Sequence, residues 1–581
     1  MIKTLAKSVR EYKKQTILTP LLVSFEVVIE CLIPFITTFF ITEIESESPR
    51  LKVIIGWGLL LVTLAVLSLT FGALAGRTCA VASCGFAKNL RHDLYYSVQN
   101  FSFANIDKFS SSSLVTRMTT DVSNVQMAFM MIIRTAIRAP FMIIFSLVMV
   151  IVTSPRMAIG FAVIVPILGL GLMGIMLTAH PIFKSVFKKY DRLNNSVQEN
   201  VHGMRVVKSF VREDHERKKF ARASEEVAND FKRAEKILAL NTPLMQLCFN
   251  LLMLFTCYFG TRLIITSNES MLKGAELSAI LTYGAQILMS LMMLSMIIVM
   301  LVLSAASAAR ISEVLNEKST IVNPESPVTE VADGSVEFKN VSFSYSEKAE
   351  KPSLSDIDLS IKAGETVGIV GGTGSGKTSL VQLISRLYDV SEGSVTVGGV
   401  DVREYDLEAL RTQVATVLQK NILFSGTIRE NIRWGDPDAT DEEIERICKL
   451  AAADEFIKSF PDGYDTYIEQ GGTNVSGGQK QRLCIARALI RKPKILILDD
   501  STSAVDTKTD ALIRRAFAEE IPGTTKIIIA QRISSVEHAD KIVVMNSGKI
   551  ESMGTHEQLL ETSPIYREVY ESQTRGGKDD E

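Results

Sequence analysis

The chain has 581 residues, which is enough for more than one domain. Its mean hydropathy of +0.20 and its 22% of charged residues are too apolar for an ordinary soluble protein, and the apolar excess lies before about residue 310. The net charge of −2 argues against nucleic acid as a partner, because neutralising phosphates requires a basic field. The seven cysteines are scattered without a CxxC pair, which is typical of small buried thiols in a reducing cytosol.

Six apolar segments of the N-terminal half are each long enough to cross a hydrocarbon core of about 30 Å. They lie near residues 17–42, 54–76, 134–153, 157–178, 243–265 and 277–305. Short links at 153–156 and 266–274 are expected on one side of the bilayer, and the long polar stretches 77–130 and 179–240 on the other. Because structureless loops of that length are uncommon, we expect these long stretches to be helical extensions.

Charge predicts the orientation of these spans. Five Lys and Arg residues precede the first span, and the stretch 179–240 is rich in both, whereas the first outer loop carries Glu43, Glu45 and Glu47. By the positive-inside rule, both termini are expected to be cytoplasmic. We predict no cleavable signal peptide, because the first apolar run is too long and lacks a small-residue cleavage site.

Three polar residues inside the spans are candidates for substrate contact. Glu26 and Glu30 stand four residues apart on one face of the first span. A charge at a helix centre costs about 2.5–3.5 kcal/mol, so such residues usually face a bundle interior or a water-filled cavity. Two interpretations of the acids stay open: contact with a cationic substrate, or a structural polar contact. Gln286 precedes five methionines of the last span, whose spacing favours ordinary packing.

The C-terminal half reads as a soluble α/β domain that contains a P-loop. A β-rich run at 366–370 leads into Gly-x-x-x-x-Gly-Lys-Thr and then into an apolar helical pattern, the context that this motif requires. Its backbone N–H groups and the helix N-terminus favour phosphate. Lys377 is expected to contact the β- and γ-phosphates, and Thr378 to ligate Mg²⁺. The expected nucleotide contacts in this loop are Gly371, Gly372, Thr373, Gly374, Ser375, Gly376, Lys377, Thr378 and Ser379.

Two further motifs follow the P-loop. The apolar run 494–499 ends in Asp499, the Walker B arrangement that holds Mg²⁺ through a carboxylate. Ser476, Gly477, Gly478 and Gln479 open a helical pattern, and a Ser-Gly-Gly turn at a helix start is an anion site.

Residues 475–479, Val-Ser-Gly-Gly-Gln, resemble the signature motif of ABC transporters. Gln419 resembles their Q-loop, residues 503–506 their D-loop, and Tyr345 the aromatic residue that stacks on adenine.

The N-terminal half carries the same resemblance. Segments 103–122 and 196–213 are similar to the two intracellular loops of bacterial multidrug-type ABC exporter half-transporters, so the likeness covers about residues 1–573. It implies a multi-domain membrane protein, in which an all-α six-helix transmembrane domain (1–320) is fused to an α/β P-loop NTPase cassette (321–575) and a tail (576–581).

The resemblance also implies ligands and a partner. ATP and Mg²⁺ are expected, with Thr378, Gln419 and Asp499 around the metal. In that family two cassettes pair head to tail, and each ATP lies between the P-loop of one and the signature of the other. A second half-transporter is therefore expected.

Three positions depart from the family pattern. Asp500 stands where a catalytic glutamate is usual, Gln531 stands where a histidine is usual, and 469–472 read Glu-Gln-Gly-Gly instead of Gly-Glu-x-Gly. Aspartate is shorter than glutamate by one C–C bond, about 1.5 Å, and the loss of a positioned base typically costs about 10²–10⁴ in rate. Glutamine can hydrogen-bond but cannot carry a charge. The pattern resembles the degenerate half of a heterodimeric exporter, whose own site turns ATP over slowly while its signature completes the partner's competent site.

We therefore expect one half of a heterodimeric ABC exporter of the bacterial plasma membrane that moves amphipathic small molecules. The alternatives are a slow homodimeric exporter, an ATP-gated channel or sensor, and an exporter of lipids or peptides. An importer is disfavoured, because importers usually keep cassette and spans on separate chains.

Overall fold

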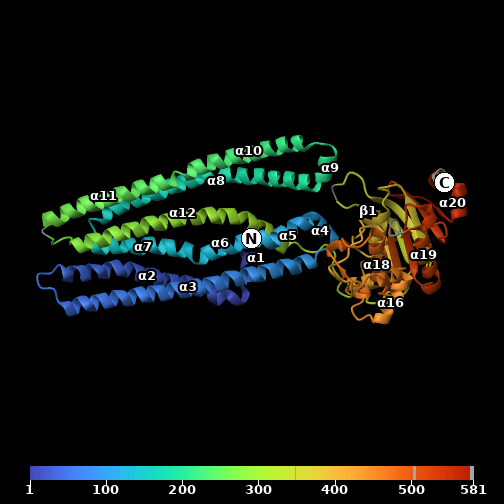
Figure 1. Ribbon diagram of the computed structural model, residues 1–581, viewed down its shortest axis with the longest axis horizontal. Coiled ribbons are helices and arrows are strands. Elements are labelled where there is room, and N and C mark those ends of the chain that lie inside the picture. The colour runs from blue at the N-terminus through green and yellow to red at the C-terminus, as the bar shows by residue number, and fades with distance from the viewer. Residues whose placement is uncertain (268, 347–348, 501–505, 576–581) are drawn as a thin grey trace. The chain divides into compact units, whose positions relative to one another are not determined.

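The computed structural model describes residues 1–267, 269–346, 349–500 and 506–575 (Figure 1), so the expected tail at 576–581 lies outside it. The chain divides into two compact units. One contains residues 1–99 and 110–317, and the other contains residues 100–109 and the chain from 318 onward.

The first unit is built from helices alone among its described residues. In chain order they are α1 (Ile2–Ala6), η1 (Lys7–Tyr12), α2 (Lys13–Ile44), α3 (Leu51–Gln99), α5 (Ser111–Thr116), η2 (Arg117–Asp121), α6 (Val122–Ile133), α7 (Thr135–Thr153), α8 (Ala158–His202), α9 (Met204–Ser209), α10 (Glu213–Leu238), α11 (Asn241–Ser267) and α12 (Gly274–Asn316).

Within the part of this unit that the structure describes, six helical stretches are long and apolar enough to cross a membrane, which confirms the predicted number. The expected extensions are helical too: α3 runs on to Gln99 and α8 to His202 (Figure 1). Large apolar side chains such as Leu59 and Leu69 are exposed on α3. A helix can present such a surface to lipid, because all its backbone hydrogen bonds are internal.

Helices α2, α7 and α12 pack against one another in the first unit. Val23 and Val27 of α2 are fully buried, and the Cys31 thiol contacts Met142 of α7. The buried Tyr283 hydroxyl of α12 donates a hydrogen bond to the Cys31 carbonyl at 2.9 Å.

The described residues of the second unit form three β-sheets. The largest is six-stranded, in the order β12 (Lys549–Gly554), β11 (Lys541–Asn546), β3 (Thr366–Gly371), β10 (Thr525–Ile529), β9 (Ile495–Asp499) and β6 (Val414–Val417). The second has the order β2 (Leu354–Ile361), β1 (Val336–Phe343), β4 (Glu392–Val397) and β5 (Val400–Asp401), and β7 (Gly426–Thr427) pairs with β8 (Tyr467–Ile468).

The described residues of this unit also form helices. They are α4 (Phe103–Phe109), α13 (Lys377–Ile384), α14 (Leu407–Gln413), α15 (Ile428–Arg433), α16 (Asp441–Leu450), α17 (Asp454–Ser459), η3 (Gly463–Asp465), η4 (Gln470–Gly472), α18 (Gly477–Leu489), α19 (Thr507–Glu520), η5 (Ile533–Ser535), α20 (His556–Thr562) and α21 (Pro564–Arg575).

The six-stranded sheet positions the predicted nucleotide motifs. Strands β3, β10 and β9 are parallel neighbours, and Ile529 at the end of β10 pairs with Ile369 on one side and Asp499 on the other. In open α/β sheets, ligands bind outside the carboxyl ends of the strands. The P-loop, Asp499 and the chain after Ile529 therefore meet at one edge.

Candidate nucleotide site

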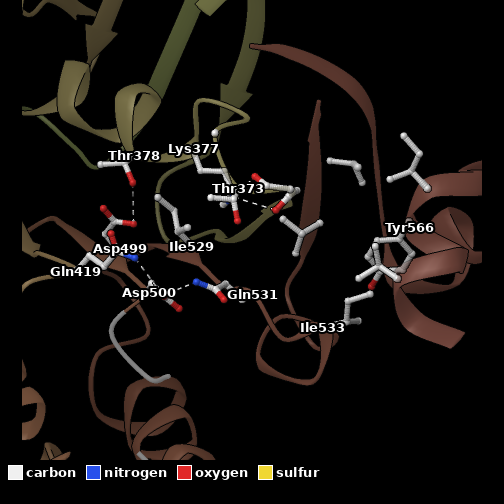
Figure 2. Close-up of a pocket in the computed structure, with 17 residues that line it drawn as sticks. Thr373, Lys377, Thr378, Gln419, Asp499, Asp500, Ile529, Gln531, Ile533 and Tyr566 are labelled. Atoms are coloured by element: carbon white, nitrogen blue, oxygen red, sulfur yellow. Dashed lines mark hydrogen bonds between the residues drawn. The ribbon is translucent and has the colours of Figure 1, made fainter. Parts of the chain in front are cut away.

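A cavity of about 330 Å³ lies at this carboxyl edge (Figure 2). It is lined by the P-loop, by the ends of β9 and β10, and by the C-terminal helix α21. The lining residues are Val370, Gly371, Gly372, Thr373, Gly374, Lys377, Thr378, Gln419, Asp499, Asp500, Ile529, Gln531, Ile533, Val544, Ile565, Tyr566 and Val569.

The P-loop has the backbone of a phosphate cradle. Gly371 and Gly376 have φ values of 152° and 96°, where a side chain is strained. A Cβ at Gly371 would also lie 2.2 Å from the Met545 carbonyl oxygen. The Lys377 Nζ donates to the Gly371 and Gly372 carbonyls at 2.9 and 2.8 Å. Burial lowers the pKa of Lys377, and the nearby Asp499 carboxylate opposes that shift.

The side chains expected around Mg²⁺ include a hydroxyl and a carboxylate in contact. The Thr378 Oγ1 donates to the Asp499 Oδ1 at 3.2 Å, and Asp499 is 2% exposed. Burial raises the pKa of Asp499, so a cation beside it would offset the cost of its desolvation. Hydroxyl and carboxylate oxygens suit Mg²⁺, which is usually bound through one or two carboxylates together with substrate phosphates. These residues therefore fit the expected ion.

The two residues that depart from the family pattern contact each other. The Gln531 Nε2 donates to the Asp500 Oδ2 at 2.8 Å (Figure 2), and the Gln419 Nε2 donates to the same oxygen at 3.4 Å. Asp500 has a φ of 50°, and its N–H donates to the Ile529 carbonyl at 3.0 Å. The backbone thus directs this carboxylate at two amides, and both occupy one of its oxygens.

Tyr345 lies beside the first turns of α13. Its hydroxyl forms a hydrogen bond with the Ser379 Oγ at 2.9 Å and donates to the Gln382 Oε1 at 3.0 Å. It is 49% exposed, and it is not among the described residues that line the cavity. Its ring meets the Tyr388 ring edge-on at 5.1 Å, and the Tyr388 hydroxyl donates to the Asp107 Oδ2 in α4 at 2.6 Å.

The predicted signature begins α18 as a capping box. The Ser476 N–H donates to the Gln479 Oε1 at 2.9 Å, and the Gln479 N–H donates to the Ser476 Oγ at 3.3 Å. No described residue of the signature lines the cavity. Glu469 pairs locally, because its Oε2 accepts from the Thr473 Oγ1 at 2.7 Å.

The predicted D-loop at 503–506 falls mostly outside the described residues. Its last residue, Asp506, caps α19 and accepts from the Thr509 N–H at 2.9 Å.

Helix α21 also belongs to this site and was not predicted from the sequence. Ile565, Tyr566 and Val569 line the cavity, and the Gln573 side chain bonds to the backbone at Gln531 and Ile533. The helical spacing of the first three residues indicates an apolar face. No motif, however, connects that face with a nucleotide.

The three candidate substrate-contact residues of the membrane spans form two separate hydrogen-bonded contacts. Arg138 of α7 donates to the Glu26 Oε1 at 2.6 Å and to both oxygens of Glu30 at 2.8 Å. The Gln286 Oε1 instead accepts from the Ser146 Oγ at 3.1 Å. The structure therefore brings the two acids together around a guanidinium, and Gln286 bonds elsewhere on α7.

Two family models match the chain. A model of the ABC transporter transmembrane region matches residues 16–291, and a model of the ABC transporter matches residues 354–503.

Curated relatives span both halves of the chain. It is 37% identical over 517 residues to the uncharacterized ABC transporter ATP-binding protein YfiB of Bacillus subtilis, covering 89% of each chain. It is 37% identical to the uncharacterized ABC transporter ATP-binding protein Rv1273c of Mycobacterium tuberculosis, covering 84% of each. It is 35% identical to the mitochondrial potassium channel ATP-binding subunit of Mus musculus, covering 84% of this chain and 68% of that protein.

Among solved structures, a bacterial Atm1-family ABC exporter with ATP bound aligns with a TM-score of 0.84. The sequence identity is 23%, and the match covers 97% of this chain and 99% of the other. This likeness shows the fold.

Proposed function

The chain belongs to the ABC transporters, and from that membership we propose that it is the degenerate-site subunit of a heterodimeric exporter of amphipathic small molecules. It is a multi-pass cell-membrane protein with a cytoplasmic cassette. The observation that carries the proposal is the hydrogen bond between Asp500 and Gln531.

Slow hydrolysis follows from the chemistry of this pair. A general base must come within hydrogen-bond reach of its water, and the Asp500 carboxylate is both short and already bonded to two amides. Gln531 stays neutral, so it cannot supply a positive charge beside the γ-phosphate. Mg²⁺, held by Thr378 and Asp499, would neutralise phosphate charge when bound. The P-loop thus retains ATP, and Asp500 and Gln531 hydrolyse it slowly.

The signature serves the other site in this proposal. The side chains of Ser476 and Gln479 each accept a hydrogen bond from the backbone N–H of the other residue. These bonds fix the start of α18, and a helix N-terminus favours an anion. Because these residues do not line the chain's own cavity, they are available to an ATP bound by a partner cassette. A chain that has an intact signature but an altered catalytic base supports different roles for the two ATP sites of a two-chain transporter.

The experiment compares steady-state ATPase of the purified chain alone with that of the chain plus a second half-transporter. We expect slow turnover alone and turnover higher by about 10²–10⁴ with a partner that carries Glu and His at the two positions. Brisk ATPase of the chain alone would instead identify a homodimeric exporter.

An ATP-gated channel is the second candidate, because one relative is named as the ATP-binding subunit of a potassium channel. The two functions differ in their need for hydrolysis. Ion flux into proteoliposomes in the presence of a non-hydrolysable ATP analogue would support the channel. A requirement for hydrolysable ATP would support the exporter.

The Glu26–Arg138–Glu30 cluster bears on the substrate. Two carboxylates face one guanidinium, so the cluster has one uncompensated negative charge when all three groups are ionised. The salt bridges support a structural role, and the remaining charge supports contact with a monocationic substrate. Transport by Glu30→Gln separates the two roles. Loss for cationic substrates only would indicate contact, whereas equal loss for neutral substrates would indicate structure.

A further inference from the structure

The loop that carries Gln531 is held from the C-terminal helix by one side chain. The Gln573 Nε2 of α21 donates to the Gln531 carbonyl at 2.8 Å, and its Oε1 accepts from the Ile533 N–H at 2.9 Å. One planar amide therefore binds a backbone acceptor and a backbone donor two residues apart. Such a pair of bonds restrains the direction of the main chain between them.

The restrained main chain orients the side chain of Gln531. Gln531 uses its carbonyl for Gln573 and its amide Nε2 for the Asp500 Oδ2, at 2.8 Å. The Gln419 Nε2 reaches the same carboxylate oxygen. A continuous set of hydrogen bonds thus runs from α21 to the residues at the edge of the nucleotide cavity.

The position of α21 does not depend on Gln573. Tyr566 of this helix is 1% exposed, and its hydroxyl forms a hydrogen bond with the His556 Nδ1 at 2.7 Å. Ile565 packs against the core of the unit. Gln573 itself is exposed, so replacing it removes its two bonds and leaves the anchor of the helix in place.

We propose that Gln573 is a positioning residue that sets the Gln531 amide on Asp500 and thereby prolongs the retention of ATP. The proposal deepens the proposed function, because it rests on Gln531 as the group beside the terminal phosphate. It assigns a role to the C-terminal helix in the nucleotide site of its own chain.

A double-mutant cycle on the full-length chain in lipid nanodiscs tests this role. The dissociation rate of a non-hydrolysable ATP analogue with Mg²⁺ is measured for wild type, Gln573→Ala, Gln531→Ala and the double variant. In Gln573→Ala, binding must order the Gln531 loop that Gln573 otherwise holds, at a cost of about one net hydrogen bond, so the analogue should be released about fivefold faster. Because Gln573 acts through Gln531, the double variant should release it no faster than Gln531→Ala does.

Two further variants separate positioning from general stability. Gln573→Glu still accepts from the Ile533 N–H but cannot donate to the Gln531 carbonyl, so it should also release the analogue faster. Gln558→Ala removes a cap bond to the Thr555 N–H in the adjacent α20 and does not touch the loop. It should release the analogue at the wild-type rate.

The proposal is wrong if Gln573→Ala keeps the wild-type rate, if the two alanine effects add, or if Gln558→Ala has the same effect. The readout does not require hydrolysis, so brisk ATPase of the chain alone would refute the slow site and leave this cycle interpretable. Additive effects together with slow ATPase would refute only the role of Gln573.

Discussion

Restoring the family's usual residues at positions 500 and 531 should raise ATP hydrolysis at this chain's own site. In the present geometry the Asp500 Oδ2 lies 2.8 Å from the Gln531 Nε2, so the carboxylate is held by the amide. Asp500→Glu extends the reach of the carboxylate by about one C–C bond, 1.5 Å. Gln531→His removes the amide that binds it.

The expected gain follows from what a positioned base contributes. That contribution is about 10²–10⁴ in rate. A glutamate introduced at position 500 should recover about 10² of it, because the rest of the site is unchanged. Asp500→Glu alone should gain less, because Gln531 still binds the carboxylate. Single-turnover phosphate release from the purified chain with Mg²⁺-ATP measures both variants.

The control is the same double variant with Lys377→Ala, which weakens the P-loop and should abolish the gain if it arises at this site. A double variant that binds ATP as tightly as wild type and hydrolyses it no faster would show that positions 500 and 531 do not limit hydrolysis. A gain that survives Lys377→Ala would place the activity elsewhere.

Two other predictions concern buried charges. Burial raises the pKa of Asp499 in the folded chain, so its ionised form destabilises the unliganded fold, and wild type loses stability as pH rises through that pKa. Asp499→Asn should therefore melt at a higher temperature than wild type at about pH 8, with a difference that shrinks toward about pH 4, and it should lose stabilisation by Mg²⁺-ATP. Arg138→Gln leaves Glu26 and Glu30 facing each other and should cost about 3 kcal/mol, seen as a lower melting temperature in detergent. Adding Glu26→Gln and Glu30→Gln should recover most of that loss, and no recovery would show that Arg138 stabilises by packing alone.

The elements of both halves could be predicted from local patterns. Apolar runs of about 20 residues identify membrane spans because every buried backbone group must be satisfied within the helix. The P-loop could be recognised because its glycines are demanded by backbone geometry, as the φ of Gly371 shows. Both signals are contained in one stretch of chain.

Contacts between distant stretches could not be predicted in the same way. The bond between Asp500 and Gln531 depends on the pairing of β9 with β10 and on the positive φ of Asp500. Arg138 lies near the start of the third predicted span, and no local pattern marks it as the partner of both acids in the first. Gln573 belongs to no motif, because any residue type with a donor and an acceptor at the right point of α21 could bind the loop.

ATPase of this chain assembled with its proposed partner half-transporter separates the roles of the two sites, through Ser476→Ala and Lys377→Ala in this chain. Ser476 begins the signature helix and does not line the chain's own cavity, whereas Lys377 donates within that cavity's P-loop. We expect Ser476→Ala to abolish most of the hydrolysis, because it disables the competent site, and Lys377→Ala to reduce it far less. Undiminished hydrolysis in Ser476→Ala, with hydrolysis lost in Lys377→Ala, would contradict the assignment of the two sites.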